Sequence, residues 1–281
     1  MSTYSGQGRR MSTNRIQLSR WLNNFLARRG LQVPDQRPLY KYQCGHEEYL
    51  SLRGLLQGLD GSREDAGQRG DKAFNSSFVL FCAEWYRREY RAEFGWTWDP
   101  LYDALELRLD APILARVVPK GLETFWGRPV HTYESERRNY LGSVFREGGL
   151  PFQLLRASDS RFNHLFRQLL RQYDQAHLLG LSTPEQVRRR LEHVHLPQVF
   201  KSEASIELIA EMVDQLLHLV SNYSLDEAQD PVDALDKAYP KWRAGFPLPL
   251  DEETGTGLLN SLLTTASDER KKLRVSLGKF S

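Results

Sequence analysis

Two consecutive segments carry the side chains best suited to holding a negatively charged partner. Between residues 159 and 178, four hydrogen-bonding side chains recur at spacings of three and four: Arg161, His164, Gln168 and Arg171. The next segment contains Arg188, Arg189 and Arg190 in a row. A guanidinium group is a planar fork of donors that matches phosphate and carboxylate. We therefore predict that these seven residues form a nucleic-acid-binding surface.

The elements that position these side chains are expected to be two helices. Phe162, Phe166 and Leu170 share one stripe of residues 159–178, which predicts an amphipathic helix. Gly180 follows as a turn residue, and Thr183, Pro184 and Gln186 then suggest a new helix start with a capping box over residues 184–193. A helix, a glycine-containing turn and a short arginine-bearing helix are typical of a helix-turn-helix.

The match to a helix-turn-helix is partial when it is checked by position. Ala176 is a small residue four before Gly180, as the motif requires. Gln186 and Arg189 occupy places where the motif has apolar residues. An ordinary helical hairpin with solvated or salt-bridged arginines therefore remains open as an alternative.

Other chemistry is poorly supported by the sequence. Residues 255–257 lack the third glycine of a dinucleotide loop, and His193 with His195 lacks a third metal ligand. Glu269 and Lys271 resemble the acid and lysine pair of metal-dependent nucleases, but that pair requires a strand and a partner aspartate. We expect no cofactor, no metal and no catalytic residue.

Composition excludes a disordered chain and a membrane protein. Hydrophobic residues make up 40% and charged residues 26% of the 281 residues, which is ordinary for a globular protein, and no apolar run is long enough to span a bilayer. The first 14 residues lack the apolar core of a secretory signal, so we expect a cytoplasmic location. Cys44 and Cys82 are then expected to be buried and unpaired.

Charge is biased in type and in position. Of the 38 basic residues 9 are lysine and 29 arginine, a bias that fits interfaces and equally a GC-rich genome. Residues 121–200 carry 11 arginines against 8 acids, whereas residues 201–255 carry 4 bases against 12 acids. The acidic stretch has three interpretations: it binds a basic partner, it masks the basic segment in cis, or it is a solvated helix face.

Hydrophobic periodicity predicts an all-α fold, an irregular multi-helix bundle with short extended segments and an arginine-rich helical hairpin. The remaining helices are expected over 14–29, 46–56, 74–90, 133–145, 202–221 and 258–265. Residues 74–90 are the expected central helix, with Arg87 and Arg88 on its solvated side, and Phe94, Trp96 and Trp98 are expected to pack on it rather than to stack on bases.

Two segments are expected to be extended. Residues 39–43 are short and aromatic, and residues 273–277 alternate like a strand. The terminal segment either pairs with the first one, or the chain is the front part of a longer protein.

Four regions are expected along the chain. Residues 1–13 are predicted to be a disordered tail, residues 14–130 an aromatic-rich helical subdomain with a mobile loop at 60–72, residues 131–225 an arginine-rich helical subdomain, and residues 226–281 an acidic linker, a short helix and the strand-like segment.

Several segments together resemble a known protein family. They are Trp21 to Leu26, Phe78 to Tyr86, Arg138-Asn139-Tyr140-Leu141-Gly142, Gly148-Gly149-Leu150-Pro151 and Phe246-Pro247-Leu248-Pro249-Leu250. They look like the front portion of large bacterial proteins encoded beside helicases in defence islands, such as the large non-helicase subunit of Druantia-type anti-phage systems. The resemblance implies a part in phage defence alongside a helicase, and it transfers no site residues.

The first hypothesis is therefore a non-catalytic helical interaction module that binds a helicase-type partner protein and, as a second partner class, DNA. The alternatives are a free-standing helix-turn-helix DNA-binding regulator and a metal-dependent nuclease. The sequence leaves the oligomeric state open.

Overall fold

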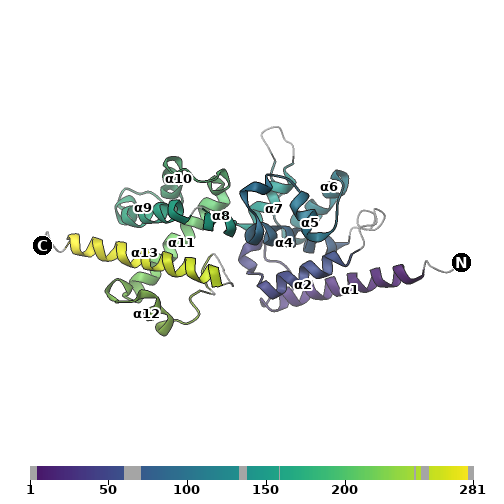
Figure 1. Ribbon diagram of the computed structural model, residues 1–281, viewed down its shortest axis with the longest axis horizontal. Coiled ribbons are helices and arrows are strands. Elements are labelled where there is room, and N and C mark those ends of the chain that lie inside the picture. Colours follow the sequence, from purple (N-terminus) through teal and green to yellow (C-terminus); the bar gives the residue numbers. More distant parts are fainter. Residues whose placement is uncertain are drawn as a thin grey trace. The chain divides into compact units, whose positions relative to one another are not determined.

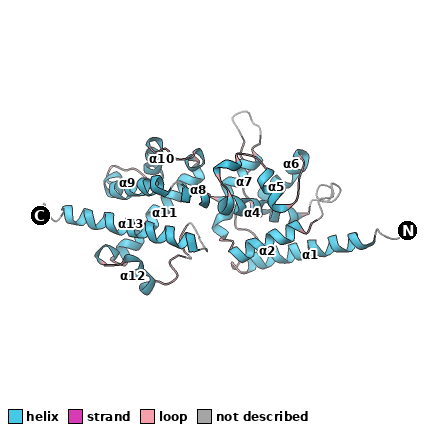
Figure 2. Ribbon diagram, viewed as in Figure 1, coloured by secondary structure: helices cyan, strands magenta, loops and turns pink. Residues whose placement is uncertain are grey.

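The structure, a computed structural model, describes residues 5–59, 71–132, 138–157, 159–243, 245–247 and 253–277. The chain divides into two compact units, residues 1–154 and 155–281. The fold is all-α, as predicted: Figure 2 shows helices and loops, and among the described residues the one pairing of extended backbone is an isolated bridge between Thr132 and Arg138.

The described residues of unit 1 form six complete α-helices and the first half of a seventh. They are α1 (Ser5–Ala27), α2 (His46–Gln57), α4 (Lys72–Glu89), α5 (Asp99–Leu105), α6 (Ala111–Pro119), α7 (Tyr140–Gly148) and α8 (Phe152–Ala157), which crosses into unit 2. Short 3-10 turns lie at Leu39–Tyr42 and Ala92–Phe94, and Lys120–Trp126 is π-helical.

Helix α4 is the centre of unit 1, as the sequence predicted. Asp71 caps it by accepting hydrogen bonds from the backbone N–H groups of Ala73 and Phe74, at 3.0 and 3.3 Å. Every residue from Phe74 to Arg88 is buried. A helix buried on all sides must be covered by other elements, and α1, α2, α7 and residues 120–126 pack around it (Figure 1).

The expectation that Arg87 and Arg88 lie on a solvated side was wrong. Both are buried, and both form ion pairs with the fully buried Glu84 one turn earlier. The Nη2 atom of Arg88 also donates to the backbone carbonyl of Cys44 at 2.6 Å. The helical pattern at residues 87–89 looked polar, but a buried carboxylate and a free carbonyl make burial of the guanidinium groups tolerable.

Two of the three aromatic residues after α4 pack on the helix, as predicted, whereas Trp96 is 48% exposed and contacts α7 instead. Ring centroids lie 5.7 Å apart for Trp85 and Phe94 and 6.1 Å apart for Phe78 and Trp98. Trp96 lies 5.1 Å from Phe145 of α7 at an interplanar angle of 83°. These edge-to-face and stacked contacts join α4 to α7 and to the segment between α4 and α5.

Gly148 allows α7 to approach α4 closely. A Cβ atom added there would lie 2.3 Å from the carbonyl oxygen of Ala83. Because no side chain fits in that gap, the Gly148-Gly149 pair is a packing requirement as well as a helix end.

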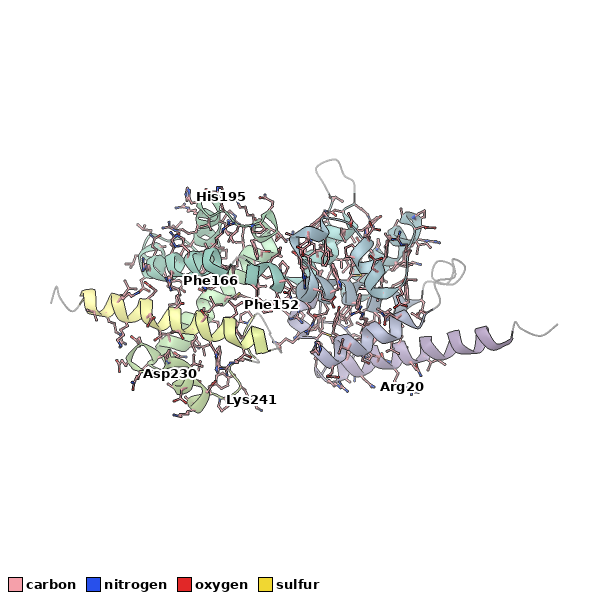
Figure 3. All side chains as sticks on the ribbon, viewed as in Figure 1. Arg20, Phe152, Phe166, His195, Asp230 and Lys241 are labelled. Atoms are coloured by element: carbon pink, nitrogen blue, oxygen red, sulfur yellow. The ribbon has the colours of Figure 1, made fainter. Side chains whose placement is uncertain are left out.

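Unit 2 is built from the following helices and short turns: α9 (Asp159–Leu178), α10 (Thr183–His193), Gln198–Lys201, α11 (Glu203–Asn222), Leu225–Glu227, α12 (Pro231–Ala238) and α13 (Glu253–Leu277). Helix α11 packs against α9, α10 and α13 and buries Ile209, Val213 and Leu216 completely. Phe166 of α9, labelled in Figure 3, is also fully buried. The amphipathic stripes predicted for residues 159–178 and 202–221 therefore form this core.

Four predicted element boundaries or types were wrong. Helix α1 begins at Ser5, whereas a helix start at residue 14 had been predicted. Residues 39–42 form a 3-10 turn instead of an extended segment. Helix α7 begins at Tyr140 because Asn139 caps it, accepting from the N–H of Gly142 at 2.9 Å, whereas a helix had been predicted from residue 133.

The fourth error concerns the C-terminal segment. Residues 273–277, predicted to be strand-like, are the last turns of α13. Arg270 and Arg274 are one helical turn apart, and both form ion pairs with carboxylates of unit 2. Five residues are too few to separate alternation from a helical period. The predicted loop at 60–72 lies mostly, and Leu248 to Leu250 entirely, outside the described residues.

Candidate functional site

The turn between α9 and α10 is set by local backbone and side-chain contacts. Gly180 has φ +76°, a left-handed value that glycine adopts without strain. The N–H of Leu181 donates to the carbonyl of Ala176 at 3.0 Å and closes the end of α9.

Ser182, and not Thr183 as predicted, caps α10. Both its N–H and its hydroxyl donate to Oε2 of Glu185, at 2.8 and 2.7 Å, and this bonding lowers the pKa of Glu185. Thr183 donates instead to Oδ1 of Asp214 on α11 at 2.8 Å.

Helix α10 presents its arginines outward because its apolar residues face inward. Val187 and Leu191 are buried, and the helix packs against both α9 and α11. Gln186, at a position where a helix-turn-helix has an apolar residue, is also buried and donates to the carbonyl of Leu181 at 3.2 Å. Gln186 can be buried at this position because its side-chain amide donates a hydrogen bond to a backbone carbonyl of the turn.

The structure gives the seven predicted site residues different surroundings. Arg171 pairs with Glu269 on α13, Nε to Oε2 at 2.5 Å, and Arg188 pairs with Glu203 on α11, Nη2 to Oε2 at 2.7 Å. Arg161 donates to the backbone carbonyl of His195 at 3.1 Å.

The other four site residues have no such ion pair. His164 and Gln168 contact each other at 2.8 Å along α9. Arg189 and Arg190 have no carboxylate within ion-pair distance in the described part of the chain. The seven residues therefore form no uniform cationic surface, and Arg189 and Arg190 on α10 lack an ion pair among the described residues, although Glu185 one turn earlier acts on Arg189 electrostatically.

Two acids of the acidic stretch contact the basic segment within the same chain. Glu203, at the start of that stretch, neutralises Arg188. Asp214 accepts hydrogen bonds from Thr183 and from Tyr173, both at the α9–α10 hairpin. These contacts hold the hairpin on α11. They do not involve Arg189 or Arg190.

Arg189 and Arg190 border a groove between α9 and α10, which we call the hairpin groove. It has a volume of about 380 Å³. Its lining includes the apolar side chains of Leu169 and Leu181 and the polar side chains of Gln186, Arg189, Arg190 and His193. An apolar floor with cationic walls is suited to a ligand that has both apolar and negatively charged groups.

Sequence reasoning missed the apolar tip of the hairpin. Leu178 and Leu179 are 88% and 73% exposed, and Leu179 also lines the hairpin groove. These two exposed leucines beside the groove provide apolar surface that a partner could cover. In the sequence, the pair Leu178-Leu179 directly before the turn residue Gly180 could have indicated this exposed apolar tip.

The residues considered for catalysis lie in unsuitable places. Glu269 lies in helix α13, where its carboxylate accepts from Arg171 and Lys272, so the strand that a nuclease site requires is absent from its surroundings. Burial raises the pKa of the Cys44 and Cys82 thiols well above the ordinary value. Among the described residues, no group of three His, Cys, Asp or Glu side chains is arranged to hold a metal ion.

None of the helices in the described ranges combines the length and the apolar character needed to cross a bilayer.

Comparison with known proteins assigns both units to one family. The YjiT N-terminal domain model matches residues 9–150, which is half of the chain, and the YjiT second domain model matches residues 157–275. The chain belongs to the YjiT family. Protein YjiT of Escherichia coli K12 is 47% identical over 256 residues, which cover 91% of this chain and 49% of that protein. The chain thus spans about half the length of this YjiT relative, and no solved structure matches it.

Proposed function

We propose that the chain is a non-catalytic helical interaction module that binds a partner protein through the tip of its α9–α10 hairpin. The observation that carries the proposal is the coincidence of exposed Leu178 and Leu179 with the unpaired charges of Arg189 and Arg190 on one hairpin. Interfaces combine apolar anchors with arginine at their centre. Thr183 of α10 and Tyr173 of α9 both donate to Asp214 of α11, and these hydrogen bonds hold the hairpin on α11 and preorganise it for binding.

The setting of this function is proposed from the resemblance to large defence-island proteins. It supplies a helicase-type protein as the partner and phage defence in the bacterial cytoplasm as the context. The YjiT relative is about twice as long as this chain. We propose that the activity which the module serves resides in the other half of such a protein or in the partner.

The experiment is affinity capture with the wild-type chain, identification of the captured protein, and direct binding measurements with that protein purified. Leu179→Asp is expected to weaken binding at least tenfold because it removes an apolar anchor and adds repulsion. Leu50→Asp is the matched control, since Leu50 is an exposed leucine of α2 in unit 1. Equal loss in both variants, or in neither, would refute the hairpin as the binding surface.

DNA binding is the second candidate function, and the outward arginines of α10 favour it. Arg188, Arg189 and Arg190 lie away from the buried face of that helix, although Arg188 is neutralised by Glu203. Changing all three to alanine is expected to abolish binding to duplex DNA and to flatten its salt dependence. Sequence-specific binding would point to the free-standing regulator, and nonspecific binding to the module.

A metal-dependent nuclease is the remaining alternative, and the helical, ion-paired setting of Glu269 gives it no support. Magnesium-dependent cleavage of DNA that Glu269→Gln abolishes would establish it.

A further inference from the structure

The hairpin groove carries two arginines that have no ion pair, whereas two other arginines of the hairpin are neutralised. Arg171 and Arg188 lie on the same two helices and each has a carboxylate partner. Glu185, the acid one turn before Arg189 on α10, accepts from the N–H and hydroxyl of Ser182 and acts on Arg189 through the electrostatic field without forming an ion pair with it. Arg189 and Arg190 are left to face the groove without an ion pair to a carboxylate of the described residues.

Apolar surface is available directly beside these charges. Leu169 is buried at the bottom of the groove, and Leu181 is half-buried in its wall. Leu179 extends the apolar lining outward to the hairpin tip, where it is 73% exposed. The groove therefore offers two neighbouring contacts of different chemistry, one for a carboxylate and one for an aliphatic side chain.

This combination selects among negatively charged partners. A DNA backbone presents phosphates but no aliphatic side chains, so it would satisfy Arg189 and Arg190 and leave the leucines in water. A protein segment with acidic and aliphatic residues on one face satisfies both, as amphipathic segments do in helix-lined grooves. Bidentate pairing of a guanidinium with a carboxylate adds orientation to this contact.

We infer that the hairpin groove binds an acidic amphipathic segment of a partner protein, with a carboxylate held by Arg189 and Arg190 and an aliphatic side chain on Leu169, Leu179 and Leu181. The inference rests on the proposed function and names the chemistry of its partner.

The test uses the full chain and a fluorescently labelled 16-residue peptide that carries glutamate and leucine on one helical face. Fluorescence anisotropy is expected to show saturable binding that weakens at least tenfold when every glutamate is replaced by glutamine. The double variant Arg189→Ala, Arg190→Ala is expected to lose at least tenfold as well. Arg167→Ala is the matched control because Arg167 is an exposed arginine of α9 outside the groove lining, and its affinity is expected to equal that of the wild type.

Circular dichroism and the thermal midpoint establish whether each variant is folded. We expect both variants to fold, because Arg189 is exposed and Arg190 is half-buried. Three outcomes overturn the inference: equal affinity for the glutamate and glutamine peptides, equal loss in Arg167→Ala, or competition by duplex DNA at lower concentration than unlabelled peptide. A concentration-dependent dimer that the double variant abolishes would also overturn it, since the groove would then hold a second copy of the chain.

Failure of the inference and failure of the proposed function are distinguishable. Loss of the captured partner in Leu179→Asp, together with no preference for the glutamate peptide, removes only the acidic chemistry. If the wild-type chain prefers the glutamate peptide but Leu179→Asp still binds the captured partner, the proposed function is refuted and the inference about the chemistry of the groove stands.

Discussion

Arg171 on α9 donates to Glu269 on α13 from Nε to Oε2 at 2.5 Å, across 98 residues of sequence. The Glu269 side chain is 3% exposed, whereas that of Arg171 is 56% exposed. Lys272 adds a second contact to the same carboxylate at 2.9 Å. This ion pair therefore anchors the C-terminal half of α13, beyond its buried leucines, to the helix that carries the candidate site.

Replacing Glu269 with glutamine is expected to destabilise the chain by about 1–2 kcal/mol, because it removes the charge partner of Arg171 in a nearly buried position. Chemical denaturation at pH 7 measures the change. Lys237→Ala is the control, since the Lys237–Asp233 pair is solvent-exposed and its loss is expected to change stability much less. Equal effects in the two variants would contradict the anchoring role.

The same pair predicts a pH dependence of stability. The hydrogen bond from Arg171 is the largest cause that lowers the pKa of Glu269 in the folded chain below its ordinary value of 4.5. A carboxyl with a lowered folded-state pKa stabilises the fold fully above its unfolded-state pKa and loses that contribution as pH falls through the folded-state pKa. The difference in unfolding free energy between wild type and Glu269→Gln is therefore expected to shrink below about pH 4.5 and to stay constant from pH 6 to 8.

Gly148→Ala is expected to destabilise unit 1 by about 1–3 kcal/mol, because the new methyl group would collide with the carbonyl oxygen of Ala83. Gly54→Ala is the matched control in helix α2, where an added Cβ meets nothing within 4 Å. That change is expected to stabilise the chain by about 0.5–1 kcal/mol through helix propensity. Thermal unfolding of both variants checks the opposite signs, and a stabilising Gly148→Ala would show that α7 lies farther from α4.

Glu84→Gln is expected to cost about 3–5 kcal/mol, since it removes the buried carboxylate that the two buried guanidinium groups of Arg87 and Arg88 share. Urea denaturation of the purified variant gives the value. The control is Glu93→Gln, where the exposed pair with Arg91 spans 3.9 Å and its loss is expected to change stability by less than about 0.5 kcal/mol. A loss below 1 kcal/mol in Glu84→Gln would mean that the cluster is hydrated.

Cys44 and Cys82 are expected to react slowly with a thiol reagent in the folded chain, because burial keeps both thiols protonated and inaccessible. Absorbance of the released thiolate from a disulfide reagent counts reactive thiols before and after denaturation. Both thiols are expected to appear only after unfolding. Rapid reaction of one thiol in the native chain would contradict the burial of that cysteine.

The sequence predicted most of the helices that form the two cores, because their apolar residues recur with the period of a helix. The pattern Phe162, Phe166 and Leu170 in α9 and the pattern Ile209, Val213 and Leu216 in α11 are examples. Short segments were predicted less well. Residues 273–277 alternate over five positions, and such a length fits a strand and a helix end equally.

The sequence identified the residue types of the candidate site but not which of its arginines are paired with carboxylates. The seven hydrogen-bonding residues were recognised from spacing alone, since spacing decides which side chains share a helix face. Whether an arginine on that face is available depends on which carboxylate folds against it. Glu203 lies 15 residues from Arg188, and Glu269 lies 98 residues from Arg171.

By itself, the sequence determined that the chain is helical, that residues 74–90 are central and that arginine gathers on two successive helices, since these properties follow from local periodicity and composition. Tertiary structure decided that Arg87 and Arg88 are buried, that Arg171 and Arg188 are neutralised and that Arg189 and Arg190 border a groove. The physical reason is that elements from other parts of the chain produce the burial, and that the carboxylate partners of Arg171 and Arg188 lie 98 and 15 residues away, so no local pattern records them.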